Sequence, residues 1–536
     1  MSVSSLVLIL VTPILLVLIC TLLTTMHAPI PGPLLLKHTA LPLLYAETIA
    51  GSRDRFLTAL HKAHGPVVQI APRHVSIGDT AGVRALSAAG RRLDRNFALP
   101  FFHNYGAENL VATVNGALHY ERRRPLRSIY AARMAESHEL SGVIMGAAQS
   151  MVDLARQEAR VDGRIEAKRL LHFAILDIMS VVVYGSANRI CTLTDTQQRA
   201  AWQPEVDFQT QRFLSPAAAV MFLLPSITMW LRKTGLAPHA IAGKYPAGHI
   251  SDTLGRTAWD TIQLQDSSHS HSFESLMHRL YTHFHSNGPT AAVPSVEYIL
   301  SDCLDHFWAG VTTTTDAMAP LLRHLSMPGN AERQQRLRHE ILGSAAEAGV
   351  SVTNLSAQQL KQLPFLNAVI RETLRLHPPI AFNVERRVNE KQGISVHGCT
   401  IPLGWEVTAP AMAMQKSEHV FLDAAAWCPE RWLNHEPDRD VDATSKEDVR
   451  KMKTHFFAFG SGPRMCLGLN VAYSIMRGLV AGIYGTVKTQ MEVDEHAKKI
   501  QSSKEQPDYS KKQEPEGVMA FVAEKKAKVW LNIVDS

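Results

Sequence analysis

One cysteine near the C-terminal end of the chain lies in a glycine-rich segment whose residue types suit a metal ligand. Residues 456–468 read Phe-Phe-Ala-Phe-Gly-Ser-Gly-Pro-Arg-Met-Cys-Leu-Gly, and the apolar run over residues 471–483 indicates a buried helix. A thiolate at Cys466 can be the proximal ligand of a haem iron, where it pushes electron density onto the metal and favours O–O cleavage. The alternative is a buried, inert cysteine in a turn.

The neighbours of this cysteine favour the ligand interpretation. Gly460, Gly462 and Gly468 would let backbone N–H groups approach the sulfur, and such bonds set its donor strength and redox potential. Phe459 would cover the ligand from water. Arg464 is placed to meet an anionic haem propionate by charge-assisted hydrogen bonding.

A Glu–Arg pair lies on a helix predicted over about residues 363–377, which ends before two prolines. Glu372 and Arg375 are three residues apart and therefore share one face of this helix. The residues around them are apolar, which predicts buried charges that need a further partner. Arg431, in a later Pro-Glu-Arg-Trp segment, is the candidate partner. The alternative is an ordinary solvated pair on a helix surface.

A run of threonines interrupts another helical stretch, residues 301–324. Residues 309–314 read Ala-Gly-Val-Thr-Thr-Thr, and threonine hydroxyls compete for backbone carbonyls in a helix. With Gly310 adding no side chain, this run predicts a local distortion that leaves space for dioxygen and a hydroxyl to hand it protons. The alternative is a regular helix with a tolerated polar stripe.

The elements that position these segments are predicted to be mostly helices, with a few short strands. Strand patterns occur at residues 67–77, around Pro72, at 394–409, and at 518–522 and 529–533 after a polar loop. Residues 213–231 are apolar but carry prolines. They indicate either a helix, loop and helix in contact with a membrane or an ordinary buried helix.

The first 25 residues predict a transmembrane anchor. Residues 3–23 carry no charge and are long enough to cross a bilayer, whereas the features of a cleaved signal peptide are not clear. The first basic residues after this segment, Lys37, Arg53 and Arg55, place the bulk of the chain on the cytosolic side by the positive-inside rule. Residues 26–40 are a proline-rich hinge, which leaves residues 41–536 as the catalytic domain.

Composition narrows the functional classes. The chain has 536 residues, of which 46% are hydrophobic, and a net charge of +6. No dense basic cluster with interleaved aromatic residues occurs, so nucleic acid is not an expected partner. The six cysteines are scattered without metal-finger spacing, which suits a reducing compartment.

The order of the motifs resembles that of the cytochrome P-450 family. ExxR at 372–375, PERW at 429–432 and FGxGxRxCxG at 459–468 follow one another as they do in that family. The resemblance runs from about Pro31 to the C-terminus, and the style of the motifs looks like membrane-bound eukaryotic members, particularly fungal ones of secondary metabolism. It implies a mainly α fold with small β-sheets behind an N-terminal transmembrane helix.

The resemblance also assigns site residues. It implies a haem b bound non-covalently with Cys466 as the axial ligand, and a Glu, Arg, Arg triad of Glu372, Arg375 and Arg431 with a structural role. The basic cluster at 119–127, which is otherwise a solvated face, matches the family's WxxxR motif with His in place of Trp. The residues expected around the haem are therefore Phe459, Gly460, Arg464, Gly468, His119, Arg123 and Arg386, with Arg387 as the competitor of Arg386.

The family's oxygen-activating pattern, AGx(D/E)T(T/S), places its threonine at Thr313. Thr312 stands where the family has an acid, which leaves open the group that feeds protons to the hydroxyl. Asp316 lies a turn further on and could substitute only through water. Thr313 and Thr312 are the expected catalytic residues.

The function implied is insertion of one oxygen atom from O2 into an apolar small molecule, by hydroxylation or epoxidation, in terpenoid or polyketide biosynthesis. Electrons would come from NADPH through a separate cytochrome P-450 reductase, with cytochrome b5 as a further candidate donor, at the endoplasmic reticulum membrane. The substrate path would be lined by residues 105–115, 208–240, the face around Phe307 and Ala309, 380–384 and 517–521. Thr312 leaves room for an alternative, an isomerase, dehydratase or coupling enzyme, and a haem-binding protein without turnover is a third candidate.

Overall fold

The computed structural model describes residues 30–48, 53–88, 90–95, 103–212, 234, 249–264, 274–380, 384–433, 446–491 and 528–535. The predicted anchor at 1–25 lies outside these ranges, as do the first residues of the predicted hinge and the strand predicted at 518–522. Within the described ranges, no helix is both long enough and apolar enough to cross a membrane.

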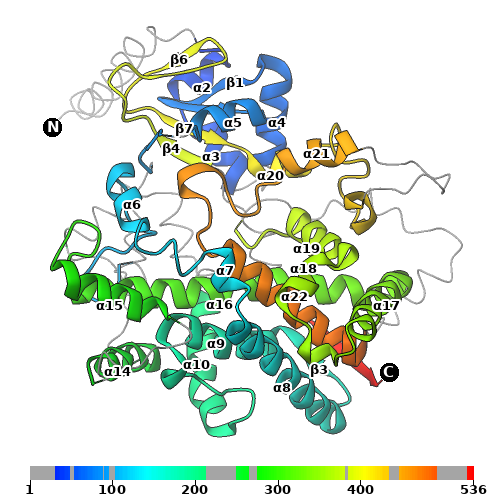
Figure 1. The fold of residues 1–536 in the computed structure, drawn as a ribbon. Coiled ribbons are helices and arrows are strands. Elements are labelled where there is room, and N and C mark those ends of the chain that lie inside the picture. The colour runs from blue at the N-terminus through cyan, green and yellow to red at the C-terminus, as the bar shows by residue number, and fades with distance from the viewer. Residues whose placement is uncertain are drawn as a thin grey trace, which may run out of the picture.

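The fold is mainly helical, with small sheets, as the sequence predicts. Figure 1 shows a lobe of strands and short helices above a larger body of long helices. The long helices are α8 (His138–Asp162), α9 (Ala167–Tyr184), α10 (Thr196–Arg212), α14 (Ile250–Leu264), α15 (Leu276–Asn287), α16 (Val296–Ser326), α17 (Ala331–Glu347), α19 (Pro364–Leu376) and α22 (Leu469–Thr486). The shorter ones are α2 (Leu34–His38), α3 (Leu41–Thr48), α4 (Arg53–His64), α5 (Thr80–Leu86), α6 (Gly116–Arg123), α7 (Ala132–Ala135), α18 (Ala357–Gln362), α20 (Ala411–Gln415) and α21 (Lys446–Thr454).

The largest sheet joins both halves of the chain. Its order is β1 (Val67–Ala71), β2 (His74–Ile77), β7 (Glu406–Ala409) and β4 (Val384–Arg387), with β2 and β7 parallel and the other pairs antiparallel. A second sheet pairs β3 (Ile165–Glu166), β9 (Trp530–Asp535) and β8 (Val487–Gln490), and a hairpin pairs β5 (Ile394–Val396) with β6 (Cys399–Ile401). The strands predicted at 67–77, 394–409 and 529–533 are confirmed.

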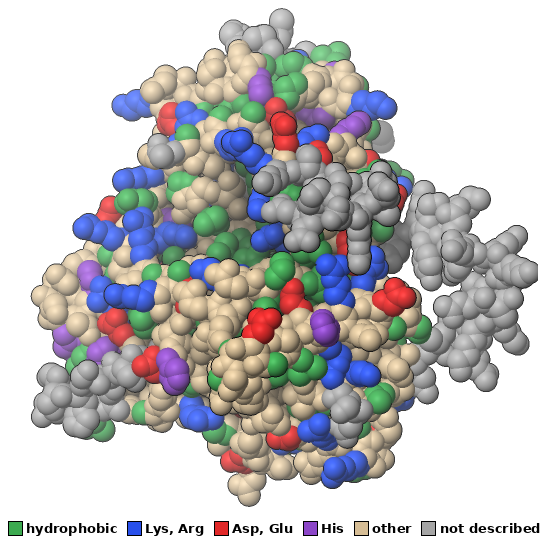
Figure 2. Space-filling view, turned by 45° about the vertical axis from the view of Figure 1, so that its right-hand side comes forward, with side chains coloured by type: hydrophobic (Ala, Val, Ile, Leu, Met, Phe, Trp, Pro, Cys, Tyr) green, Lys and Arg blue, Asp and Glu red, His purple; other side chains and the backbone are tan. Residues whose placement is uncertain are grey.

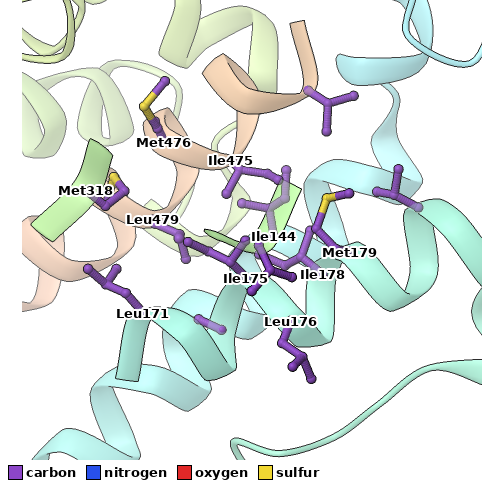
Figure 3. Close-up of a cluster of buried hydrophobic side chains, with 14 of the residues drawn as sticks. Ile144, Leu171, Ile175, Leu176, Ile178, Met179, Met318, Ile475, Met476 and Leu479 are labelled. Carbon is purple, nitrogen blue, oxygen red and sulfur yellow. The ribbon is translucent and has the colours of Figure 1, made fainter. Parts of the chain in front are cut away.

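The core lies where α9 packs against α16 and α8 packs against α22. Almost every residue of α9 is buried, and Figure 3 shows its Ile175, Ile178 and Met179 beside Ile144 of α8 and Ile475 of α22. Such a continuous apolar surface is the main source of the folding free energy.

Small residues let these helices approach closely. A Cβ atom at Gly482 of α22 would lie 2.5 Å from the Cβ of Ala148 in α8, and one at Gly310 of α16 would lie 2.4 Å from Cε of Met179 in α9. Gly310 therefore serves the packing of α16 on α9. This differs from the sequence interpretation, in which Gly310 left space for dioxygen.

Replacement of Gly482 by alanine tests this close packing. Overpacking costs about 1–3 kcal/mol, and the better helix propensity of alanine returns about 1 kcal/mol. We expect Gly482→Ala to lower the melting temperature measured by circular dichroism. The matched control is Gly146→Ala in α8, where the added Cβ meets no atom within 4 Å; it should be neutral or stabilising. Equal melting temperatures for the two variants would contradict this account.

Candidate active site

The cysteine segment forms a tight loop before α22. Gly460 and Gly462 have φ angles of 73° and 70°, in the left-handed region that favours glycine. The backbone N–H of Cys466 donates to the carbonyl of Phe459 at 2.8 Å, which closes the loop. Phe459 packs on Tyr473, with ring centroids 5.2 Å apart.

The environment of the Cys466 sulfur pulls its pKa in both directions. The side chain is exposed on one side and surrounded by protein on the others. Burial raises the pKa of the thiol, whereas a hydrogen bond from the backbone of Gly468 and the charge of Arg123 act to lower it. The guanidinium of Arg123 also donates from Nη1 to the carbonyl of Met465 at 2.7 Å, so α6 is bound to the cysteine loop.

Several cationic side chains converge beside this loop. Arg464 donates from Nη1 to the carbonyl of Thr113 at 2.8 Å and from Nη2 to that of Val114 at 2.7 Å. Its Nε atom is buried and has no hydrogen-bond partner among the described residues. Burial, with the charges of Arg95 and Arg386 nearby, lowers the pKa of Arg464 to about 9.

Burial and repulsion between positive charges also lower the pKa values of the other side chains in this group. Burial and the charge of Arg95 lower the pKa of Arg386 to about 10. Burial and the charge of Arg464 lower the pKa of His119 to about 2, so its imidazole is neutral. Buried like charges that repel one another, together with an orphaned guanidinium N–H, make a site suited to carboxylate groups.

Arg95 is a member of this group that the sequence analysis missed. Its backbone N–H donates to the carbonyl of Val114 at 3.0 Å, and the neighbouring Asp94 forms a β-bridge with Arg387. Arg387 itself is exposed and lies 3.4 Å from Glu406, so Arg386 is the arginine of that pair that joins the cationic group. Arg95 lies in no motif, and only the bridging of distant segments brings it here.

The basic run at 119–127 divides into two sets. His119, Arg122 and Arg123 face inward, and Arg122 donates to Glu108 at 2.5 Å and to Thr113 at 2.6 Å. Arg124 and Arg127 are exposed, and the guanidinium of Arg127 lies 4.8 Å from the ring centroid of Tyr120.

Helix α16 runs through the threonine segment without interruption, so the predicted local distortion is wrong. The hydroxyls of Thr312 and Thr313 donate to the carbonyls of Trp308 at 2.8 Å and of Ala309 at 2.6 Å, one turn earlier. Each hydroxyl thus bonds to a carbonyl four residues earlier in the same helix, and α16 continues through the segment without a break. Asp316 lies 3.0 Å from Nζ of Lys168 on α9.

Glu372, Arg375 and Arg431 form a buried network. Arg375 binds the carboxylate with both Nε and Nη2, at 2.9 and 2.8 Å, and Nε of Arg431 donates to the same carboxylate at 3.1 Å. The backbone N–H of Cys428 and the indole of Trp432 complete its hydrogen bonding, at 3.0 and 2.8 Å. Every polar atom of Glu372 is therefore satisfied inside the core, as a buried charge requires.

Parts of the predicted substrate path lie in the described ranges and parts do not. Ala309 is exposed on α16, whereas Phe307 is wholly buried against Tyr184 and Trp202, which makes its assignment to the path wrong. Residues 213–233, 235–248, 381–383 and 517–521 lie outside the described ranges. Figure 2 shows a hollow on one face, with hydrophobic side chains inside and Lys or Arg side chains beside it.

Comparison with known proteins agrees with this geometry. The family model described as Cytochrome P450 matches residues 31–514. The chain is 26% identical over 461 residues to cytochrome P450 monooxygenase gsfF of Penicillium aethiopicum, covering 84% of this chain and 86% of that protein. It is 25% identical over 475 residues to cytochrome P450 monooxygenase FGM1 of Gibberella zeae, covering 87% of each. It is 24% identical over 460 residues to pisatin demethylase of Fusarium vanettenii, covering 83% of this chain and 80% of that protein.

The chain belongs to the cytochrome P450 family, which confirms the resemblance found in its motifs. It is accordingly an oxidoreductase of the monooxygenase class, and membership implies a haem b with a cysteine thiolate as axial ligand. The residues present fit that group. An accessible thiol, Cys466, lies beside buried cations and an orphaned guanidinium N–H that match the iron and the carboxylates of a haem.

The buried network gives a test that does not depend on catalysis. Removing the charge of Glu372 leaves two arginines buried without their counter-ion, which costs about 3–5 kcal/mol. We expect Glu372→Gln to lower the yield of folded protein and its melting temperature strongly. The matched control is Glu430→Gln, since Glu430 also binds an arginine, Arg333, at 2.9 Å, but both side chains are about a third exposed; its loss should cost below about 1 kcal/mol. Similar losses in the two variants would refute a special role for the buried carboxylate.

Proposed function

We propose that this chain is a haem-thiolate monooxygenase that inserts one oxygen atom from O2 into an apolar small molecule, by hydroxylation or epoxidation. The relatives named above are fungal, and this favours a role in secondary metabolism on a terpenoid or polyketide. The observation that carries the proposal is the accessible Cys466 thiol in a left-handed glycine loop, next to buried cations that repel one another. The Nε atom of one of these cations, Arg464, has no hydrogen-bond partner among the described residues.

In this proposal Cys466 is the axial ligand, and Phe459, Gly460 and Gly468 shape its loop. Five side chains would hold the carboxylates of the haem. Four of them were expected from the sequence, namely Arg464, Arg386, His119 and Arg123, and the fifth is Arg95. A bound haem supplies the reductive activation of O2. The chain's own contribution is to hold the cofactor and to direct protons.

Thr313 is the proposed proton-directing residue. Its hydroxyl hydrogen is engaged by the carbonyl of Ala309 at 2.6 Å, so the lone pairs of Oγ1 remain free to accept a hydrogen bond from water. Because Ala309 is exposed one turn away on the same face, there is room for water beside Thr313. Thr312 adds a second hydroxyl and no acid.

The second candidate is a haem-thiolate isomerase, dehydratase or oxidative-coupling enzyme. The favouring observation is that no carboxylate stands at position 312 and that Asp316 is engaged by Lys168. A haem-binding protein without turnover is the weakest candidate, since the relatives named above are monooxygenases and a demethylase.

A membrane location is supported by exposed apolar side chains close to the predicted anchor. Leu34 and Leu35 of α2 and Leu41 and Tyr45 of α3 are each more than half exposed. We propose a single-pass protein of the endoplasmic reticulum membrane, anchored through residues 1–25 and a hinge at 26–40, with the catalytic domain at 41–536 facing the cytosol. Such a surface would lie against the lipid bilayer.

Substitution of the proposed ligand tests the function. With 18O2, NADPH, a reductase and an extract of the host's small molecules, the wild type should yield a product heavier by one labelled oxygen. Cys466→Ser should abolish that product, because a serine hydroxyl does not replace the thiolate. The control Cys399→Ser, on strand β6, should retain it. A Cys466-dependent product that carries no label would establish the isomerase or coupling alternative instead.

The electron donor gives a second prediction. We propose NADPH–cytochrome P450 reductase, with cytochrome b5 as an accessory donor, docking on the exposed Arg124 and Arg127. Arg127→Gln should slow reduction of the haem by reductase about 2- to 10-fold at low salt, because acidic partners are steered by such charges. The difference should shrink as salt screens them. Arg160→Gln, exposed on α8, is the control; an equal effect there would mean that net charge alone matters.

A further inference from the structure

Helix α16 has no carboxylate next to Thr313. Its acidic residues are Glu297, Asp302, Asp305 and Asp316. Asp316 binds Lys168 on α9, and Glu297 lies in the first turn, far along the chain from the threonines. A monooxygenase consumes two protons and two electrons for each O2, since one oxygen atom leaves as water. Another group on this helix that holds a proton could supply what position 312 does not.

Asp302 and His306 form a buried titratable pair on this helix. Nε2 of His306 lies 3.8 Å from Oδ2 of Asp302, and Nδ1 lies 2.6 Å from the hydroxyl of Tyr130, whose ring stacks on the imidazole. Oδ1 of Asp302 accepts from the backbone N–H of Leu110 at 2.8 Å. Oδ2 is buried and has no hydrogen-bond partner among the described residues.

The pair shares a helix face with the threonine. His306, Ala309 and Thr313 are spaced by three and seven residues, so they lie on one face of α16. His306 and Thr313 are about 10 Å apart along the helix axis, at 1.5 Å per residue. Ala309 between them is exposed, and the imidazole retains 12% of its side-chain exposure. A short file of water molecules fits this separation.

We propose that Asp302 and His306 are the proton store of this enzyme and that they supply Thr313 through water, in place of a carboxyl group at position 312. The neutral imidazole first takes the proton of Oδ2–H of Asp302 onto Nε2, which gives an imidazolium whose Nδ1–H remains bonded to the oxygen of Tyr130. Nε2–H then passes its proton to a water, and a proton of that water file reaches Oγ1 of Thr313. The Asp302 carboxylate regains its proton from solvent. No electron moves in these steps. Tyr130 is a positioning residue that fixes the imidazole through Nδ1.

The surroundings of Asp302 and His306 shift their pKa values in directions that favour proton transfer between them. Burial lowers the pKa of His306, and the Asp302 carboxylate opposes that shift; burial raises the pKa of Asp302, and His306 opposes that shift. The pKa of His306 is thus shifted down and that of Asp302 up, and both shifts favour passage of a proton from one group to the other. The charged groups that face the pair from neighbouring positions are Arg122 and Arg123, with Asp305 near Tyr130.

The inference rests on the proposed function, and its test separates the two. The haem-loaded enzyme and reductase are supplied with NADPH and O2, and the share of electrons recovered as hydrogen peroxide is measured. His306→Phe, which keeps an aromatic ring on Tyr130, and Asp302→Asn should each slow NADPH oxidation at least about tenfold and raise the peroxide share. Glu297→Gln, which removes an exposed carboxylate in the first turn of the same helix, is the matched control and should leave both unchanged.

An infrared measurement gives a readout besides turnover. The difference between the infrared spectra of the wild type and Asp302→Asn should contain a carbonyl band of a protonated carboxylic acid, which belongs to Asp302. In His306→Phe it should persist to higher pH, because the imidazole that lowers the pKa of Asp302 is gone. If Thr313→Ala raises the peroxide share while His306→Phe does not, or if the band titrates identically in His306→Phe, the proton store is refuted and the proposed function stands. If the wild type reduces no O2, both fail.

Discussion

The carboxylate of Glu372 is the interaction on which the cysteine loop depends. It binds Arg375 and Arg431, and Arg375 in turn donates from Nη1 to the backbone carbonyl of Gln415 at 3.0 Å. The side chain of Gln415 then accepts from the backbone N–H of Phe457 at 2.5 Å, at the start of the loop that ends in Cys466. A buried ion pair adds little net stability, but it permits few geometries. The network therefore fixes where the loop begins, and the left-handed glycines fix how it turns.

The buried arginines beside the cysteine loop destabilise the fold, in contrast to the neutralised network around Glu372. Arg95, Arg386 and Arg464 are held close together with little water, although their charges repel. Burying like charges close together costs free energy, which a doubly anionic cofactor would return on binding. Folding and cofactor binding are thus linked, because the same residues destabilise the empty site and stabilise the filled one. The Nε atom of Arg464, which lacks a partner among the described residues, is the clearest sign of this linkage.

The sequence predicted the segments better than the contacts between them. The helical fold, the short strands and the motif residues follow from local patterns, since periodicity and glycine–proline signals act within a few residues. Arg95 and Gln415 could not be predicted, because each reaches the site only through pairing of distant segments. The prediction of a local distortion at residues 309–314 was wrong for a different reason. The propensity of threonine is weak, and packing of α16 on α9 overrides it. Phe307 was misplaced because apolar character alone does not tell a pocket wall from the core.

Helix α16 can serve both packing and chemistry because its faces carry different residue types. Gly310 lies so close to Met179 of α9 that a Cβ atom there would displace the end of the methionine side chain. Ala309 and Thr313 lie on another face, where Ala309 is exposed, and His306 continues that face toward Asp302. The hydroxyls of Thr312 and Thr313 bond to carbonyls of their own helix, so polar groups line the open face without breaking the backbone. A rigid helix with one polar face holds proton-carrying groups at fixed spacing, which is what ordered transfer through water requires.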